Sequence, residues 1–162
     1  MKNKPAKFIA EGALIAALYV ILTFVSAIFG LSSGVIQLRL SEALCVLPIF
    51  TPAAIPGLFV GCIVANLLTG SMIADVIFGS LATLAAAVIL YFMRKAPKIL
   101  SPVPNIVLNT AAVPLIIKYV YVVDDLLSFL FLTVGVGEII SSGVLGFLLA
   151  LFLEKHRERL KL

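Results

Sequence analysis

Six polar side chains interrupt the apolar segments of this sequence and are the residues best suited to binding a polar ligand. They are Arg39, Glu42, Asn66, Asp75, Asn109 and Glu138. The guanidinium donates hydrogen bonds, the carboxylates accept them, and the amides do both. Charged groups are costly at membrane depth and usually face a bundle interior or a watery cavity. Several such groups at one level would therefore indicate a binding pocket.

Each of these residues also has a structural interpretation. Arg39 and Glu42 are three residues apart and could pair along one helix face, and Lys118 could reach outward to Asp124 or Asp125. Asparagine amides also hold membrane helices together. Glu138 is harder to explain as packing, because no cation lies near it in sequence and a buried carboxylate needs a partner or a proton.

No catalytic or metal-binding constellation is found in the sequence. The only histidine, His156, lies in a charged C-terminal stretch, and no phosphate-binding glycine motif with a lysine is present. Cys45 and Cys62 have no nearby histidine or further cysteine, so we expect them to pack inside helices. The sequence predicts no catalytic residues, no metal and no cofactor.

The elements that must position these residues are membrane spans. Hydrophobic residues make up 62% of the 162 residues and charged residues 12%, and the mean hydropathy is +1.22. Ten of the twelve basic residues border apolar segments in three clusters. This placement predicts that the clusters mark the cytoplasmic side of a membrane and do not bind nucleic acid. The clusters are Lys2, Lys4, Lys7; Arg94, Lys95, Lys98; and Lys155, Arg157, Arg159, Lys161.

An uncharged stretch of 32 residues, Ala43 to Ala74, decides how often the chain crosses the bilayer. One helix of that length would run roughly 48 Å, against a hydrocarbon core of about 30 Å. Pro52 predicts a break at residues 50 to 52, which makes two crossings and keeps all three basic clusters on one side. The prediction is one all-α membrane domain over residues 1 to 162 with both termini cytoplasmic. Its six spans run roughly over 8–29, 40–51, 53–68, 73–93, 104–123 and 126–153.

This topology brings the polar residues together. Arg39 and Glu42 open the second span from outside, Asn66 ends the third near the outer face, and Asp75 opens the fourth there. The uncharged run between Glu11 and Arg39 exceeds the 7 to 15 residue core of a signal peptide, so the first helix is expected to be retained.

Small residues recur four apart in the first span, where Gly12 precedes Ala16 and Ala13 precedes Ala17. Such a strip lets another helix approach closely, and the sequence leaves open whether that helix is internal or belongs to a partner. Gly143 and Gly146 in the last span have the same interpretation.

Seven short motifs follow one another along the chain: 36–44 (IQLRLSEAL), Pro56-Gly57-Leu58, Gly61-Cys62, Ala65-Asn66-Leu67, 75–84 (DVIFGSLATL), Leu108-Asn109 and Val136-Gly137-Glu138. In this order they resemble the QueT family, the S components of energy-coupling factor transporters for queuosine precursors. Together they cover nearly the whole chain.

The resemblance implies a six-helix subunit that captures a 7-deazaguanine, such as the 7-cyano or 7-aminomethyl form, at the outer face. A transmembrane coupling protein and two cytoplasmic ATPases would be its partners, with Ala13 and Ala17 contacting the coupling protein. Glu42 or Asp75 beside Asn66 could read the base edge, and Glu42 is favoured because Arg39, one turn before it, could hold its carboxylate ionised and oriented. Phe29, Tyr119 and Tyr121 could cover the ring of the base. The alternatives are a membrane scaffold without a ligand and a small embedded enzyme.

Overall fold

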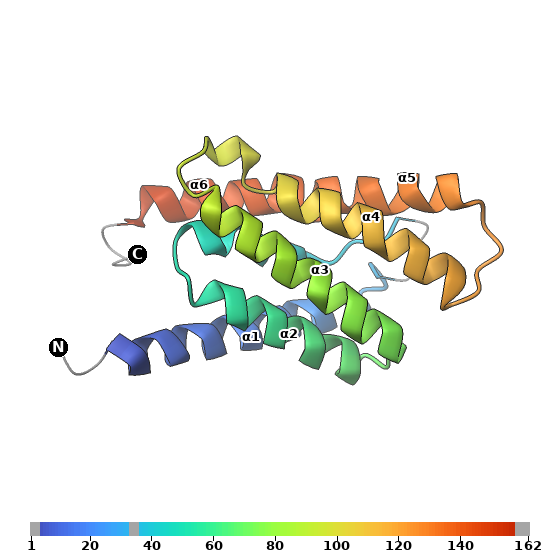
Figure 1. Ribbon diagram of the computed structural model, residues 1–162, viewed down its shortest axis with the longest axis horizontal. Helices are drawn as coiled ribbons and strands as arrows, with labels where there is room; N and C mark the ends of the chain where they lie inside the picture. Colours follow the sequence, from blue (N-terminus) through green and yellow to red (C-terminus); the bar gives the residue numbers. More distant parts are fainter. Residues whose placement is uncertain (1–3, 33–35, 158–162) are drawn as a thin grey trace.

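The computed structural model describes residues 4–32 and 36–157, and all regular structure in this part of the chain is helical. In chain order the helices are α1 (Lys4–Ile28), η1 (Leu40–Ile49), α2 (Ala54–Leu68), α3 (Ile73–Phe92), η2 (Lys98–Leu100), α4 (Val103–Tyr119), α5 (Leu127–Glu138), η3 (Ile139–Gly146) and α6 (Phe147–Lys155). The helices run roughly side by side along the long axis of the molecule (Figure 1). The expected all-α fold is confirmed.

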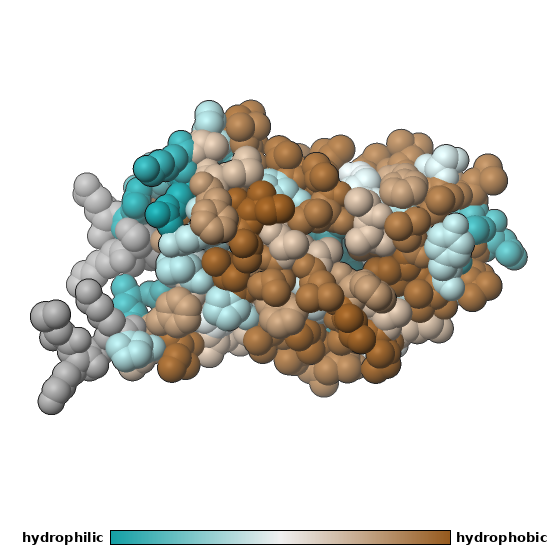
Figure 2. Space-filling model, viewed as in Figure 1, coloured by the Kyte–Doolittle hydropathy of each residue, from teal (hydrophilic) through white to brown (hydrophobic). Residues whose placement is uncertain are grey.

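Four helical segments are long and apolar enough to cross a membrane: residues 5–28, 73–92, 98–119 and 127–155. Two shorter apolar helices, η1 and α2, lie between the first and second of these segments. Brown apolar surface covers the middle of the molecule, and polar residues gather toward its two ends (Figure 2). This distribution is the one expected of a multi-pass membrane protein.

The predicted proline break is present. Helix η1 ends at Ile49 and α2 begins at Ala54, so residues 50 to 53 form the turn between two helices. Helix η1 is a 3₁₀ helix of ten residues that includes Pro48. At a rise of about 2.0 Å per residue, it spans only about 20 Å. Residues 37 to 39, directly before η1, have no regular secondary structure, and Arg39 is extended with φ −114° and ψ 106°.

Glycines allow α1 and α2 to pack closely. A Cβ on Gly57 would lie 2.7 Å from the carbonyl oxygen of Gly12, and one on Gly61 would lie 3.0 Å from the Cα of Ala16. The Gly12 and Ala16 side of the small-residue repeat therefore packs inside the protein. Ala13 and Ala17 lie on the exposed side of the same helix.

The last span is one continuous helical run in which α5 passes through a π-helical segment, η3, into α6. Helix η3 packs beside η1, where a Cβ on Gly146 would lie 3.0 Å from Val46 Cγ1. Gly143 faces the side chain of Ile106 in α4, so both glycines serve internal packing. A π-helical turn changes which residues face the bundle, and such turns often occur at functional sites.

Two termini and one connection meet at the same end of the molecule. The start of α1, the end of α6 and the η2 connection all lie at the left of Figure 1. Lys98 lies 3.7 Å from Glu154, and Thr51 donates a hydrogen bond of 2.9 Å to Glu11. Described members of all three basic clusters therefore share one end; Lys2, Arg159 and Lys161 lie outside the described residues.

The fifth span ends earlier than the sequence predicts. Helix α4 stops at Tyr119 rather than near residue 123. The ammonium of Lys118 donates to the carbonyl oxygens of Val123 and Asp125, at 3.0 and 2.9 Å, and Val122 adopts a positive φ of 54°. These contacts fold the chain back at the helix end. Lys118 thus reaches outward to Asp125, as the structural interpretation supposed, and it does so through a backbone carbonyl oxygen.

Candidate functional site: a polar cavity inside the helix bundle

A cavity of about 350 Å³ is lined in part by the α2–α3 turn and the α4–α5 loop. Both connections lie at the end opposite the basic clusters (Figure 1). The volume of the cavity falls in the range typical of small-molecule sites. The cavity is lined by residues from α1, the segment before η1, the α2–α3 turn, α4 and the α4–α5 loop. They are Thr23, Ala27, Ser32, Gln37, Arg39, Asn66, Thr69, Ser71, Asp75, Val113, Ile116, Ile117, Tyr121 and Val123. Three of the six predicted ligand-binding residues, Arg39, Asn66 and Asp75, line this cavity.

A narrow extension of about 20 Å³ continues inward. It shares Gln37, Arg39, Asp75 and Val113 with the larger cavity. The other three predicted residues, Glu42, Asn109 and Glu138, line this extension. The structure thus places all six predicted residues around two adjoining spaces.

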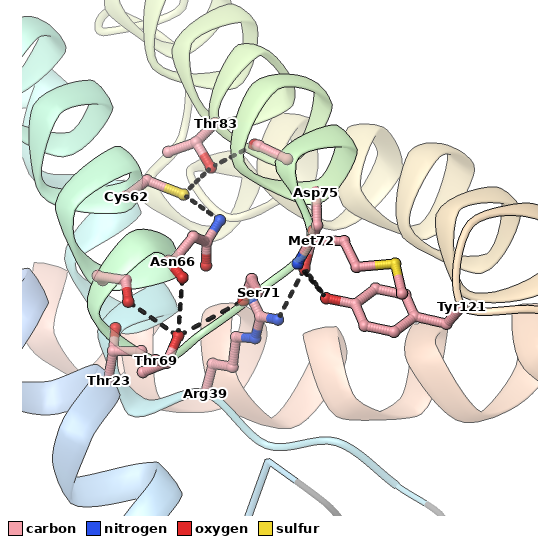
Figure 3. Close-up of polar contacts among 12 residues, drawn as sticks. Thr23, Arg39, Cys62, Asn66, Thr69, Ser71, Met72, Asp75, Thr83 and Tyr121 are labelled. Carbon is pink, nitrogen blue, oxygen red and sulfur yellow. Dashed lines mark hydrogen bonds and ion pairs between the residues drawn. The ribbon is translucent and has the colours of Figure 1, made fainter.

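Asp75 is the centre of the outer polar contacts. Its Oδ2 atom lies 3.9 Å from Arg39 Nη2 and accepts a hydrogen bond of 3.2 Å from the Tyr121 hydroxyl (Figure 3). That hydroxyl also accepts a bond of 3.1 Å from the backbone N–H of Met72. Tyr121 therefore joins the α4–α5 loop to the start of α3 at the cavity wall. Arg39 pairs with Asp75 across the bundle, not with Glu42 on its own helix as the structural interpretation supposed.

Glu42 lies deeper and is the most completely bonded carboxylate in the described chain. Only 3% of its surface is exposed. Tyr19 donates to Oε1 at 2.7 Å, while Asn105, Asn109 and Cys45 donate to Oε2 at 2.9, 3.3 and 3.3 Å. Four donors satisfy the buried charge, as burial requires.

Glu138 meets Glu42 through a shared amide. Asn105 Nδ2 donates to Oε2 of Glu138 at 3.2 Å as well as to Glu42. Glu138 is 9% exposed and lies at the end of α5, directly before the π-helical segment. Gly137, its neighbour, faces the Gln37 carbonyl so closely that any Cβ would collide with it. The glycine lets the segment before η1 lie against α5 and so places Gln37 and Glu138 at the same cavity.

Hydroxyl groups fix the start of η1, where Arg39 and Glu42 are carried. The Ser26 hydroxyl accepts a hydrogen bond of 2.8 Å from the N–H of Leu40, and the Ser141 hydroxyl accepts one of 3.2 Å from the N–H of Arg39. Thr23 donates to the Ser41 hydroxyl at 2.9 Å. Side chains of α1 and η3 therefore satisfy backbone donors that a helix start leaves without intrahelical partners.

The remaining predictions about the cavity have mixed outcomes. Cys62 is buried, as expected, but it lines the inner extension and receives a weak contact of 3.7 Å from the Asn66 amide. Phe29 and Tyr119 are not among the lining residues and are 74% and 70% exposed, so the prediction that they cover a ligand ring is wrong. They lie at or beyond helix ends, where α1 and α4 leave the bundle. The apolar walls are mostly aliphatic instead, with Tyr121 as the aromatic contributor.

Sequence reasoning missed Tyr19, Gln37 and Asn105. Asn105 and Asn109 are four residues apart in an apolar helix, a spacing that places both amides on one face and that was a usable signal. Tyr19 lies among apolar residues of α1, and only its hydroxyl contact with Glu42 distinguishes it from a packing residue.

The comparison with known families agrees with this architecture. The model of the QueT transporter family matches residues 9–155, which is nearly the entire chain. The chain belongs to the QueT transporter family. Neither the curated proteins nor the solved structures that were compared contain a significant match.

Family membership gives the chain a general role. A QueT-family chain is a multi-pass membrane protein that takes part in transport, which confirms the predicted family and membrane location. In a transporter, a cavity lined by buried charged and amide side chains is the natural place for a small-molecule substrate.

Proposed function

We propose that this chain is the substrate-binding S component of an energy-coupling factor importer and that it captures a 7-deazaguanine. The observation that carries the proposal is the polar cavity of this QueT-family chain, which is lined by Asp75, Arg39 and Asn66. The α2–α3 turn and the α4–α5 loop, which contribute to its lining, lie at the end opposite the basic clusters (Figure 1). Because basic residues favour the cytoplasmic side, the cavity would open to the exterior.

The donors and acceptors of the cavity suit a purine-like edge. A deazaguanine presents adjacent N–H donors, which a carboxylate accepts, and a carbonyl oxygen, which an amide or guanidinium donates to. Asp75 supplies the carboxylate, and Asn66 and Arg39 supply donors, all at the 350 Å³ cavity. Glu42 has four protein donors on its two oxygens, so we assign it to holding the site together rather than to reading the base.

The proposed partners follow from the same assignment. Ala13 and Ala17 form a small-residue strip on the exposed side of α1, away from the α2 contact. This strip would let a helix of a transmembrane coupling protein approach closely. Two cytoplasmic ATPases would supply the energy, since the sequence has no phosphate-binding motif of its own.

A second role, that of an embedded enzyme, has less support. The chain's single histidine, His156, lies at the end of α6 and contacts the carbonyl oxygen of Phe152, far along the helix from Glu138. A scaffold role predicts that the cavity residues affect stability alone.

The test is ligand-dependent thermal unfolding of the purified chain. A 7-deazaguanine at one hundred times its Kd should stabilise the protein by about 2.7 kcal/mol, whereas a scaffold gains nothing. Asp75→Asn should weaken binding roughly ten- to hundredfold, because it removes a charge-assisted acceptor. Glu154→Gln, which removes a carboxylate at the opposite end, is the matched control and should bind normally. If no 7-deazaguanine stabilises the folded parent, the proposed substrate class is wrong.

A further inference from the structure

The inner extension of the cavity is too small for a ring and large enough for one substituent. Its volume of about 20 Å³ is little more than the space that one water molecule requires. It adjoins the 350 Å³ cavity along Gln37, Arg39, Asp75 and Val113. A ligand whose ring occupies the larger cavity can therefore place a single small group in the extension.

The charges around this extension do not balance. Four charged side chains line it: Arg39, Glu42, Asp75 and Glu138. Arg39 is already paired with Asp75 at 3.9 Å. Within the described part of the chain, neither Glu42 nor Glu138 has a lysine or arginine nitrogen within 4.0 Å.

Two buried carboxylates that share one amide repel each other. Asn105 Nδ2 donates to both, so their Oε2 atoms lie within 2.9 and 3.2 Å of one nitrogen. Burial of like charges without a cation is strongly unfavourable, so the pair requires either a proton on one carboxylate or a positive group beside both. Glu42 has four donors, whereas Glu138 is contacted by the amides of Asn105 and Asn109, so Glu138 is the less completely bonded of the two.

We propose that this extension is a subsite for a protonated primary amine on the ligand and that Glu138 is the residue that selects it. An ammonium has three donors and no acceptor, and it would face carboxylate oxygens there. A nitrile at the same position presents only an acceptor to those oxygens. Resting on the proposed function, this assignment favours an aminomethyl over a cyano group as the 7-substituent.

The experiment compares two ligands of similar size, 7-aminomethyl- and 7-cyano-7-deazaguanine, by calorimetry on the purified full-length chain. The parent should bind the amine at least tenfold more tightly, because a charge-assisted bond is lost with the nitrile. Glu138→Gln should weaken amine binding roughly ten- to hundredfold while changing nitrile binding by less than threefold. Glu138→Asp, which keeps the charge, should retain part of the preference.

Glu154→Gln removes a carboxylate from the same helical run outside the cavity and should leave the preference unchanged. A thermal unfolding transition, measured for each variant without ligand, establishes that the variant is folded. Equal affinity of the parent for both ligands, or an equal loss for both in Glu138→Gln, would overturn the subsite. Either result would leave the proposed function intact, whereas absence of binding by both ligands to the folded parent would contradict the proposed function itself.

Discussion

Removal of the Tyr19 hydroxyl should destabilise the protein by an amount that the structure allows us to estimate. The hydroxyl donates a bond of 2.7 Å to Oε1 of Glu42, and Tyr19 is only 1% exposed. Tyr19→Phe keeps the ring and leaves one oxygen of a buried carboxylate without its donor. Hydrogen bonds to charged groups contribute about 1.5 to 3 kcal/mol, so the free energy of unfolding should fall by that amount.

The assay is thermal unfolding in detergent, with Tyr119→Phe as the matched control. Tyr119 is 70% exposed at the end of α4, so loss of its hydroxyl should change stability by less than about 0.5 kcal/mol. For a chain of 162 residues, the expected loss for Tyr19→Phe corresponds to a fall in Tm of roughly 3 to 12 °C. Equal Tm values for the two variants would refute the view that Glu42 depends on Tyr19 and holds the site together.

Three further predictions concern packing, topology and coupling. Gly61→Ala should destabilise by about 1 to 3 kcal/mol, since its Cβ would lie 2.9 Å from that of Tyr19. Gly143→Ala, whose nearest contact would be Ile106 Cδ1 at 3.4 Å, is the control in the same unfolding assay. A cysteine at position 96 should resist membrane-impermeant labelling of intact cells and one at position 70 should react; labelling at 96 from outside would contradict six spans. Ala17→Trp should reduce uptake in cells while calorimetry shows normal ligand binding, because the residue is on the exposed side of α1; an equal loss of both would place the strip inside the bundle.

The deep acids show why a membrane protein can retain charges at mid-depth. Each oxygen of Glu42 has at least one donor, and the donors come from α1, η1 and α4. Removal of one partner leaves a buried charge without compensation, whereas the complete set rigidifies the site. Glu42→Gln should therefore lower thermal stability as well as affinity.

The sequence by itself determined the membrane class, the proline break and the polar residues that gather around the cavity and its inner extension. Composition and hydropathy require helices in a bilayer, because only helices or closed barrels satisfy the backbone there. Pro52 lacks a donor N–H, and the break after Ile49 follows from that local property. Basic residues mark one side of the membrane irrespective of how the helices pack, so the shared end of the three clusters was also predictable.

Only the tertiary structure decided which polar group serves which purpose. Asn105 reaches Glu42 across 63 residues and Glu138 across 33, and no local pattern encodes these distances. Arg39 could pair with Glu42 one turn away, yet the bundle brings Asp75 to it and gives Glu42 four other donors. The reason is physical: a buried polar group is satisfied by whichever partner the packing of several helices brings within about 3 Å, and that packing is a property of the whole fold.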